Sequence, residues 1–272
     1  MNKFGGHTLS GTFFFLFGTW WTFAVWLSYI RCRKNKQCYL CRCSYAVPGM
    51  NRKLSIEGLV KIIGASACIV GDFGRIFRPD QSLDEESVQH HSMYAFFLLN
   101  GVVDVIYNAG FPFPANTDYV VLVLAITSEG LMLHLHLHGK TLLNTQTHRL
   151  LVYIVVAMIA CLIAEMCHPR SILASLGRAY FCLLHGTWLW QLAFILFSPL
   201  PSYKPWDVNS HMEAMLVASL FAWHMMALLV YVGVLGVAAW MVSRMCGRSC
   251  AAVSVDADEV GDRREPLLKR GI

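Results

Sequence analysis

The residues best suited to chemistry in this chain are its eleven histidines and a few carboxylates inside apolar stretches. Neutral imidazoles beside a carboxylate suit zinc, copper or iron. Glu129 and His136 are seven residues apart, which places them on one face of a helix, two turns apart. The pattern therefore gives the hypothesis of a metal site, with zinc as the candidate ion. Its candidate ligands are His90, Glu129, His136, His138 and His211.

The spacing of the histidines in 134–138 limits this hypothesis. His136 and His138 diverge by roughly 200° around a helix, so both can bind one ion only if the helix unwinds near Gly139. Zinc also needs its nitrogen ligands at about 2.0–2.1 Å, inside one coordination sphere. We expect His134 to face the surface. A metal site and ordinary polar packing both remain open.

A second polar group is expected deeper in the apolar stretches. Its members lie about 12–21 Å along their helices, at about 1.5 Å per residue. Ionisable groups at such depth are costly and usually face the interior of a bundle. They could relay protons, or they could join helices through hydrogen bonds of about 1 kcal/mol each. The members are Asp104, Glu129, His185, Gln191 and His224.

The elements that must position these residues are seven apolar stretches. Most reach or approach the about 20 residues needed to cross a hydrocarbon core. The sequence predicts an all-α integral membrane bundle of seven transmembrane helices over residues 1–243, followed by a flexible cytosolic tail over 244–272. The stretches are Thr8–Ile30, Ser55–Gly71, Ser92–Gly110, Tyr119–Leu137, Leu150–Cys167, Leu176–Phe197 and Met212–Val242.

Composition and charge agree with a membrane protein. Hydrophobic residues make up 56% and charged residues 14% of the chain, against about 25% charged in soluble domains. The chain has a net charge of +5, and its basic residues are concentrated in residues 31–53 and in the tail, which predicts a membrane orientation and not nucleic-acid binding. The positive-inside rule places the N-terminus outside or in a lumen and the C-terminus in the cytosol. The expected partner is the lipid bilayer, and the expected location is the Golgi, endosomal or plasma membrane.

Two further features lie on the predicted cytosolic side. Cys38, Cys41 and Cys43, with Cys32 nearby, could hold zinc or carry palmitate, and the spacing does not decide between them. Glu165 and His168 are spaced as a surface pair, and Arg178 is counted among the basic residues of this side.

Many dispersed residues form a pattern that matches a known family. They include Gly6-His7, Gly11-Thr-Phe-Phe-Phe15, Trp20-Trp21, His90, Asp104, Glu129, His136-x-His138-Gly139, His148, Glu165, Gly186-x-Trp188, Gln191, Pro205-Trp206-Asp207, His211 and Trp223-His224. With these residues the chain resembles the transmembrane protein 45 family. The resemblance implies a seven-helix multi-pass membrane protein whose biochemical activity is not established. His91, His134 and His185 depart from the family pattern, which implies that they are not essential ligands.

Several function classes remain open. The first is a metal-dependent membrane hydrolase, in which zinc activates water. The second is a transporter or channel for protons or metal ions that uses the deep polar group as a relay. The third is a non-catalytic scaffold or trafficking protein. Haem held by paired histidines is a fourth.

Overall fold

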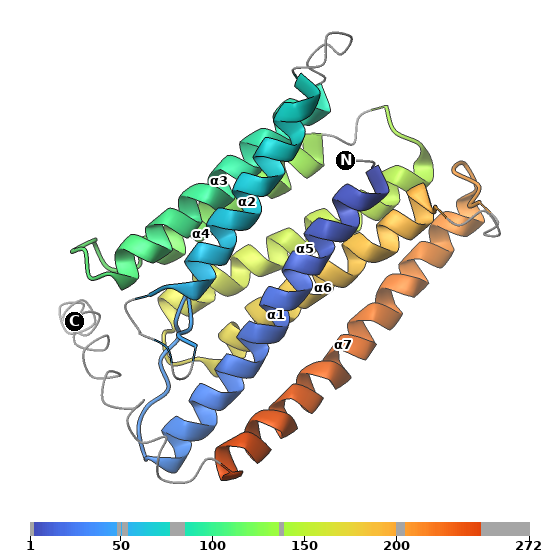
Figure 1. Cartoon of the computed structure of the whole chain (residues 1–272). Coiled ribbons are helices and arrows are strands. Elements are labelled where there is room, and N and C mark those ends of the chain that lie inside the picture. Colours follow the sequence, from blue (N-terminus) through green and yellow to red (C-terminus); the bar gives the residue numbers. More distant parts are fainter. Residues whose placement is uncertain are drawn as a thin grey trace.

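The computed structural model describes residues 3–47, 50, 54–76, 85–135, 139–199 and 205–245. These residues form seven α-helices and contain no strand (Figure 1). The predicted tail lies outside the described residues, apart from Arg244 and Met245. The helices are α1 (Lys3–Lys34), α2 (Ile56–Ile76), α3 (Glu85–Asn108), α4 (Thr117–Leu135), α5 (Leu142–Cys167), α6 (Ile172–Phe197) and α7 (His211–Met245).

The helices differ in how clearly they qualify as membrane spans. Five of them, α1, α4, α5, α6 and α7, are long and apolar enough to cross a membrane. Helices α2 and α3 are not in this set. They carry ionisable residues in their interior, among them Lys61 on α2 and Asp104 on α3. The all-helical character of the prediction is therefore confirmed, and the structure contains five clear candidate spans among its described residues.

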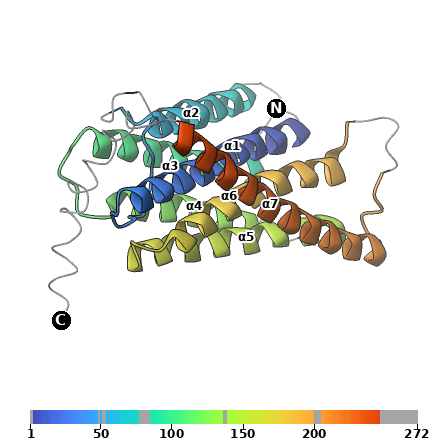
Figure 2. The same cartoon turned by 90° about the horizontal axis from the view of Figure 1, so that it is seen from below.

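The pairwise contacts arrange six of the helices in an open ring, and Figures 1 and 2 show the bundle from two sides. Neighbouring helices pack in the order α1, α6, α5, α4, α3, α2. The ring does not close, since no Cα atom of α1 lies within 8 Å of a Cα atom of α2. Helix α7 lies outside the ring, against α1, α5 and α6. The ring of helices therefore has a gap between α1 and α2.

The closest helix contact joins α1 to α6 through glycines. A Cβ atom on Gly186 would lie 2.5 Å from the backbone nitrogen of Phe15, and one on Gly11 would lie 2.8 Å from the carbonyl oxygen of Gly186. The α2–α3 contact is built alike, because a Cβ on Gly101 would lie 2.8 Å from the carbonyl oxygen of Gly58. Small residues allow membrane helices to approach at backbone distance. These contacts fix two neighbouring pairs of the ring.

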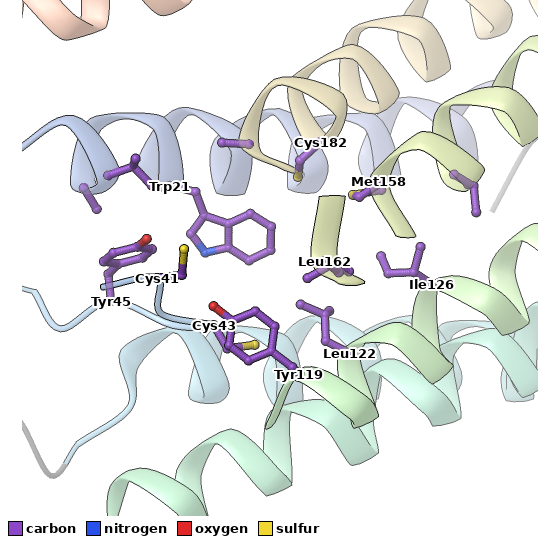
Figure 3. Close-up of a cluster of buried hydrophobic side chains, with 14 of the residues drawn as sticks. Trp21, Cys41, Cys43, Tyr45, Tyr119, Leu122, Ile126, Met158, Leu162 and Cys182 are labelled. Carbon is purple, nitrogen blue, oxygen red and sulfur yellow. The ribbon is translucent and has the colours of Figure 1, made fainter. Parts of the chain in front are cut away.

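The connection between α1 and α2 folds into the bundle. Its side chains Tyr39, Cys41, Cys43 and Tyr45, here called the buried loop, join the main core. Figure 3 shows Cys43 near Trp21, Tyr119, Leu122 and Leu162, which come from α1, α4 and α5. The backbone nitrogen of Cys41 donates to the carbonyl oxygen of Pro169 at 2.7 Å, between α5 and α6. The buried loop therefore covers one end of the ring.

This burial corrects the interpretation of the cysteine cluster. Cys41 and Cys43 are 0% and 2% exposed, so neither thiol is accessible for palmitoylation. Burial raises the pKa of the Cys43 thiol well above its usual value, which disfavours the thiolate that would bind zinc. Burial likewise raises the pKa of Tyr39 to about 12. The two inner cysteines pack as small apolar side chains, and Cys38 is exposed.

The glycine contact between α1 and α6 gives a prediction with a matched control. Gly186→Ala should lower the free energy of unfolding by about 1–3 kcal/mol, because the new Cβ meets backbone atoms that cannot move aside. Gly233→Ala on α7 should leave it unchanged or raise it by at most about 1 kcal/mol, because nothing lies within 4 Å of that position. Denaturant unfolding of the purified protein in detergent measures both. Equal effects of the two variants would contradict the close α1–α6 contact.

Candidate functional site in the helix interior

A buried ion pair joins α2 to α3 inside the ring. Lys61 Nζ donates to Asp104 Oδ2 at 2.7 Å and to Asn100 Oδ1 at 2.8 Å. The side chains of Lys61 and Asp104 are 7% and 0% exposed. The ammonium also lies 5.9 Å from the ring centroids of both Phe17 and Trp21 on α1. Each charge is thus compensated by a partner on the neighbouring helix, as ionisable groups at membrane depth require.

Glu57 connects α1, α2 and the buried loop. Its carboxylate accepts from Trp20 Nε1 at 2.6 Å, from Trp21 Nε1 at 3.0 Å and from the backbone nitrogen of Tyr45 at 2.9 Å. Because the α1 and α2 backbones stand apart, these hydrogen bonds join the two helices through long side chains. They close the α1–α2 gap at the end near the buried loop.

A second buried ion pair lies under the buried loop. Arg178 Nε on α6 donates to Glu165 Oε1 on α5 at 2.7 Å, and the hydroxyl of Tyr119 on α4 donates to Glu165 Oε2 at 2.7 Å. The other guanidinium nitrogens donate to the carbonyl oxygens of Cys43 and Arg42, at 3.2 and 2.8 Å. The guanidinium thus binds helices and loop together.

This network overturns the prediction that Glu165 and His168 form a surface pair. Glu165 and Arg178 are both 0% exposed. A carboxylate matched by a guanidinium and a phenol is compensated well enough to be buried. Arg178 therefore serves packing and does not belong to the exposed basic residues of that end.

Glu129 on α4 and His185 on α6 form a third buried pair, nearer the middle of the ring. His185 Nε2 lies 3.3 Å from Glu129 Oε1, and the imidazole stacks on Phe14 of α1 at a centroid distance of 4.2 Å. In contrast to the Arg178–Glu165 pair, this one is incomplete. Among the described residues, Glu129 Oε2 and both ring nitrogens of His185 have no hydrogen-bond partner, three atoms against two (Asp104 Oδ1 and Asn100 Nδ2) in the Lys61 group. Leaving a buried polar atom unpaired costs about 1–3 kcal/mol, so this pair is the least satisfied in the interior.

Glu129 also lines a cavity of about 110 Å³ inside the ring. All six ring helices contribute to its wall, which is apolar except at a few positions, notably Lys61 and Glu129. An engineered apolar cavity of about 150 Å³ binds benzene, so a volume of this size holds a small organic group. The lining includes Leu9, Phe13, Phe14, Ala65, Cys68, Tyr94, Phe97, Ile126, Met158 and Cys182.

The predicted metal ligands are distributed differently. His136 and His138 lie outside the described residues. His211 is the exposed first residue of α7, and His90 stacks on Tyr94 of its own helix at 6.3 Å. Of these five residues, Glu129 lines the cavity. In the part of the chain that the structure describes, no group of three or more His, Cys, Asp or Glu residues could hold a metal ion.

The residues of the deep polar group differ in how far the structure buries them. Asp104, Glu129 and His185 are buried, whereas Gln191 and His224 are half-buried. His224 packs edge-on against Trp188 at 5.6 Å. Sequence reasoning missed Lys61 as the partner of Asp104. The sequence did contain a signal for this pair. Lys61 is a cation in the second apolar stretch and Asp104 is an anion in the third, so each could compensate the charge of the other.

Charged pairs buried among long apolar helices define an integral multi-pass membrane protein. Residues 115–236, which run from the end of the α3–α4 connection into α7, match the model of a family described as "Family of unknown function (DUF716)". The match covers the helices that carry Glu129 and His185.

Known proteins with similar sequences carry names of membrane proteins. Transmembrane epididymal protein 1 of Homo sapiens is 27% identical over 184 residues, which cover 64% of this chain and 67% of that protein. Its Rattus norvegicus counterpart is 26% identical over 251 residues, covering 83% and 77%. Transmembrane epididymal protein 1A of Mus musculus is 24% identical over 262 residues, covering 88% and 82%. The chain is thus similar to membrane proteins along most of its length, and the names state no activity.

The Lys61–Asp104 pair gives a prediction through a double-mutant cycle. Lys61→Met should lower the free energy of unfolding by about 3–5 kcal/mol, because it leaves the Asp104 carboxylate buried without its cation. The double variant Lys61→Met/Asp104→Leu should be clearly more stable than Lys61→Met. Arg149→Met, at an exposed position of α5, is the control and should change stability by less than about 0.5 kcal/mol. If the destabilisation of the double variant equals the sum of those of Lys61→Met and Asp104→Leu measured alone, the two residues are not coupled.

Proposed function

We propose that this chain is a seven-span membrane protein that binds a small molecule in its interior cavity, beside Glu129 and His185. The observation that carries the proposal is the incomplete pairing of these two side chains, of which Glu129 lines the apolar cavity. Buried polar groups in native structures are almost always paired, and each exception needs a water, an ion or a ligand to explain it. An apolar pocket with a few convergent polar groups is also the usual form of a small-molecule site.

The seven-span part of the proposal depends on α2 and α3. They have 21 and 24 residues, about 32 and 36 Å at about 1.5 Å per residue, and the hydrocarbon core is about 30 Å thick. Alone, each would bring an uncompensated charge into lipid. Packed as a pair, Lys61 and Asp104 neutralise each other, so the hairpin can insert as a unit.

The orientation follows from the basic residues that end α1. Arg31, Arg33 and Lys34 lie at the end of the ring that the buried loop covers. The positive-inside rule makes this end cytosolic and places the start of α1 outside or in a lumen. Seven helices are also what the resemblance to the transmembrane protein 45 family implies, and we propose that the chain belongs to that family.

A metal-dependent activity is the main competing function. Its chemical support is the carboxylate–imidazole pair itself, since both groups are zinc ligands. Two donors leave a zinc site incomplete, and no third donor joins them among the described residues. A neutral ligand that completes the hydrogen bonding needs no further donors, which is why we favour it.

Native mass spectrometry of protein purified from cell membranes tests the proposal. We expect a non-protein mass bound to the wild type at near one per chain. Ala65→Phe should abolish it, because Ala65 is buried and lines the cavity, so the larger ring fills the space. Ile63→Phe is the matched control, because Ile63 on the same helix is 68% exposed and faces away from the core. This control should retain the bound mass.

The same samples distinguish the competing readings. Equal adducts on both phenylalanine variants, or none on the wild type, would contradict cavity binding. Zinc at one ion per chain, removed by Glu129→Gln, would establish the metal site instead. Elemental analysis of the wild type and of Glu129→Gln gives that answer independently of the mass spectra.

A further inference from the structure

The cavity lies directly inside the open seam of the ring. Leu9, Phe13 and Phe17 line it from α1, and Gly64 and Cys68 line it from α2. The Cα atoms of α1 and α2 stay more than 8 Å apart, whereas the Cα atoms of the other neighbours in the ring approach within that distance. At the seam, side chains therefore close the cavity wall.

Two sets of side chains cross this seam at different heights. Near the buried loop, Trp20 and Trp21 donate hydrogen bonds to Glu57 and fix the two helices. Further along, the ring of Phe13 packs against Gly64, where a glycine leaves room for it. A phenylalanine ring is held there by packing alone, so it can turn aside at far lower cost than the hydrogen-bonded tryptophans. Of the side chains that cross the seam, Phe13 is therefore the one held least firmly.

The outer faces of both helices next to the seam are apolar. Leu16 on α1 is exposed, as are Val60, Ile63 and Val70 on α2. In a bundle whose helices cross the bilayer, such faces contact lipid tails. A molecule that passes Phe13 therefore comes from the hydrocarbon and not from water.

The cavity volume sets what part of the ligand it can hold. At about 110 Å³, it takes a group no larger than benzene, which fills an engineered cavity of about 150 Å³. A membrane lipid does not fit whole. Only one end of a long molecule can reach Glu129, and its remaining chain must extend through the seam among the lipid tails.

The Glu129–His185 pair determines the chemistry of that end. Glu129 Oε2 is an acceptor without a hydrogen-bond partner among the described residues, so the head group that matches it is a donor. A carboxylate head has no donor to offer. An ammonium head brings three donors to this one acceptor in a mostly apolar wall, whereas a hydroxyl head brings one.

We infer that the cavity binds the hydroxyl end of a neutral long-chain lipid alcohol, which enters from the bilayer between α1 and α2. The hydroxyl bonds to Glu129 Oε2, which has no hydrogen-bond partner among the described residues. The first carbons of the chain lie against Phe13, Phe14 and Phe97. This inference rests on the proposed function and names the ligand class for the same site.

Photolabelling of the full-length protein in lipid nanodiscs tests the inference. The probe is dodecanol with a diazirine on a carbon close to the hydroxyl, and the labelled peptides are identified by mass spectrometry. Labelling should map to α4 near Glu129 and to α1 near Phe13. Unlabelled dodecanol should compete at least about tenfold better than dodecanoic acid at neutral pH, dodecylamine or dodecane, as one lost hydrogen bond in an apolar site predicts.

Variants test separately whether the probe occupies the cavity and whether Glu129 recognises its hydroxyl group. Ala65→Phe should abolish labelling, and Ile63→Phe should retain it, as in the test of the proposed function. Glu129→Leu should retain labelling but let dodecane compete as well as dodecanol. Because Glu129→Leu leaves His185 without its neighbour, Glu129→Leu/His185→Leu serves as the second variant with an apolar wall, and it should show the same loss of preference.

Three results would overturn the inference. One is equal competition by dodecanol and dodecane on the wild type. Another is labelling confined to the lipid-facing side chains of α7. The third is a water-soluble molecule without an alkyl chain, found bound in the cavity by native mass spectrometry. This result would contradict the lipid alcohol as ligand but would still support binding in the cavity.

Discussion

Every charge inside this bundle must find a partner inside the bundle, and this constraint organises the whole interior. Arg178 is the charged residue with the most partners inside the bundle. Its guanidinium binds Glu165 and two carbonyl oxygens of the α1–α2 connection, and it lies 4.3 Å from the ring centroid of Trp21. One buried cation thus joins α1, α5, α6 and the buried loop. Removing it would leave Glu165 uncompensated and release the cover of the ring.

The same constraint distinguishes the two sides of α2. Lys61 and Asp104 join α2 to α3, whereas the α1–α2 seam is bridged by tryptophans and a phenylalanine. Glu129 and His185 meet across the space that remains. Unlike the Arg178–Glu165 pair under the buried loop, they leave polar atoms without partners. The interior therefore contains structural charge at one end and an unsatisfied pair in its middle.

The sequence predicted the helices and part of the interior. Uncharged runs of membrane length specify helices directly, and depth within such a run indicated Asp104 and Glu129 as interior residues. Depth could not identify their partners. Lys61 and His185 come from helices whose neighbours depend on the packing order around the ring. Glu165 was misinterpreted because its position near a helix end is equally typical of a surface residue, and Arg178 buries it from another helix.

The account depends on α2 and α3 crossing the membrane, because without them the ring has no wall on one side. The side of the membrane that carries position 88, an exposed residue at the start of α3, decides this most directly. An impermeant thiol reagent applied to sealed vesicles should label Val88→Cys and Lys3→Cys from the same side, and native Cys38 from the opposite side. Labelling of Val88→Cys from the side of Cys38 would mean that α2 and α3 do not span, and that the cavity is not enclosed within the membrane.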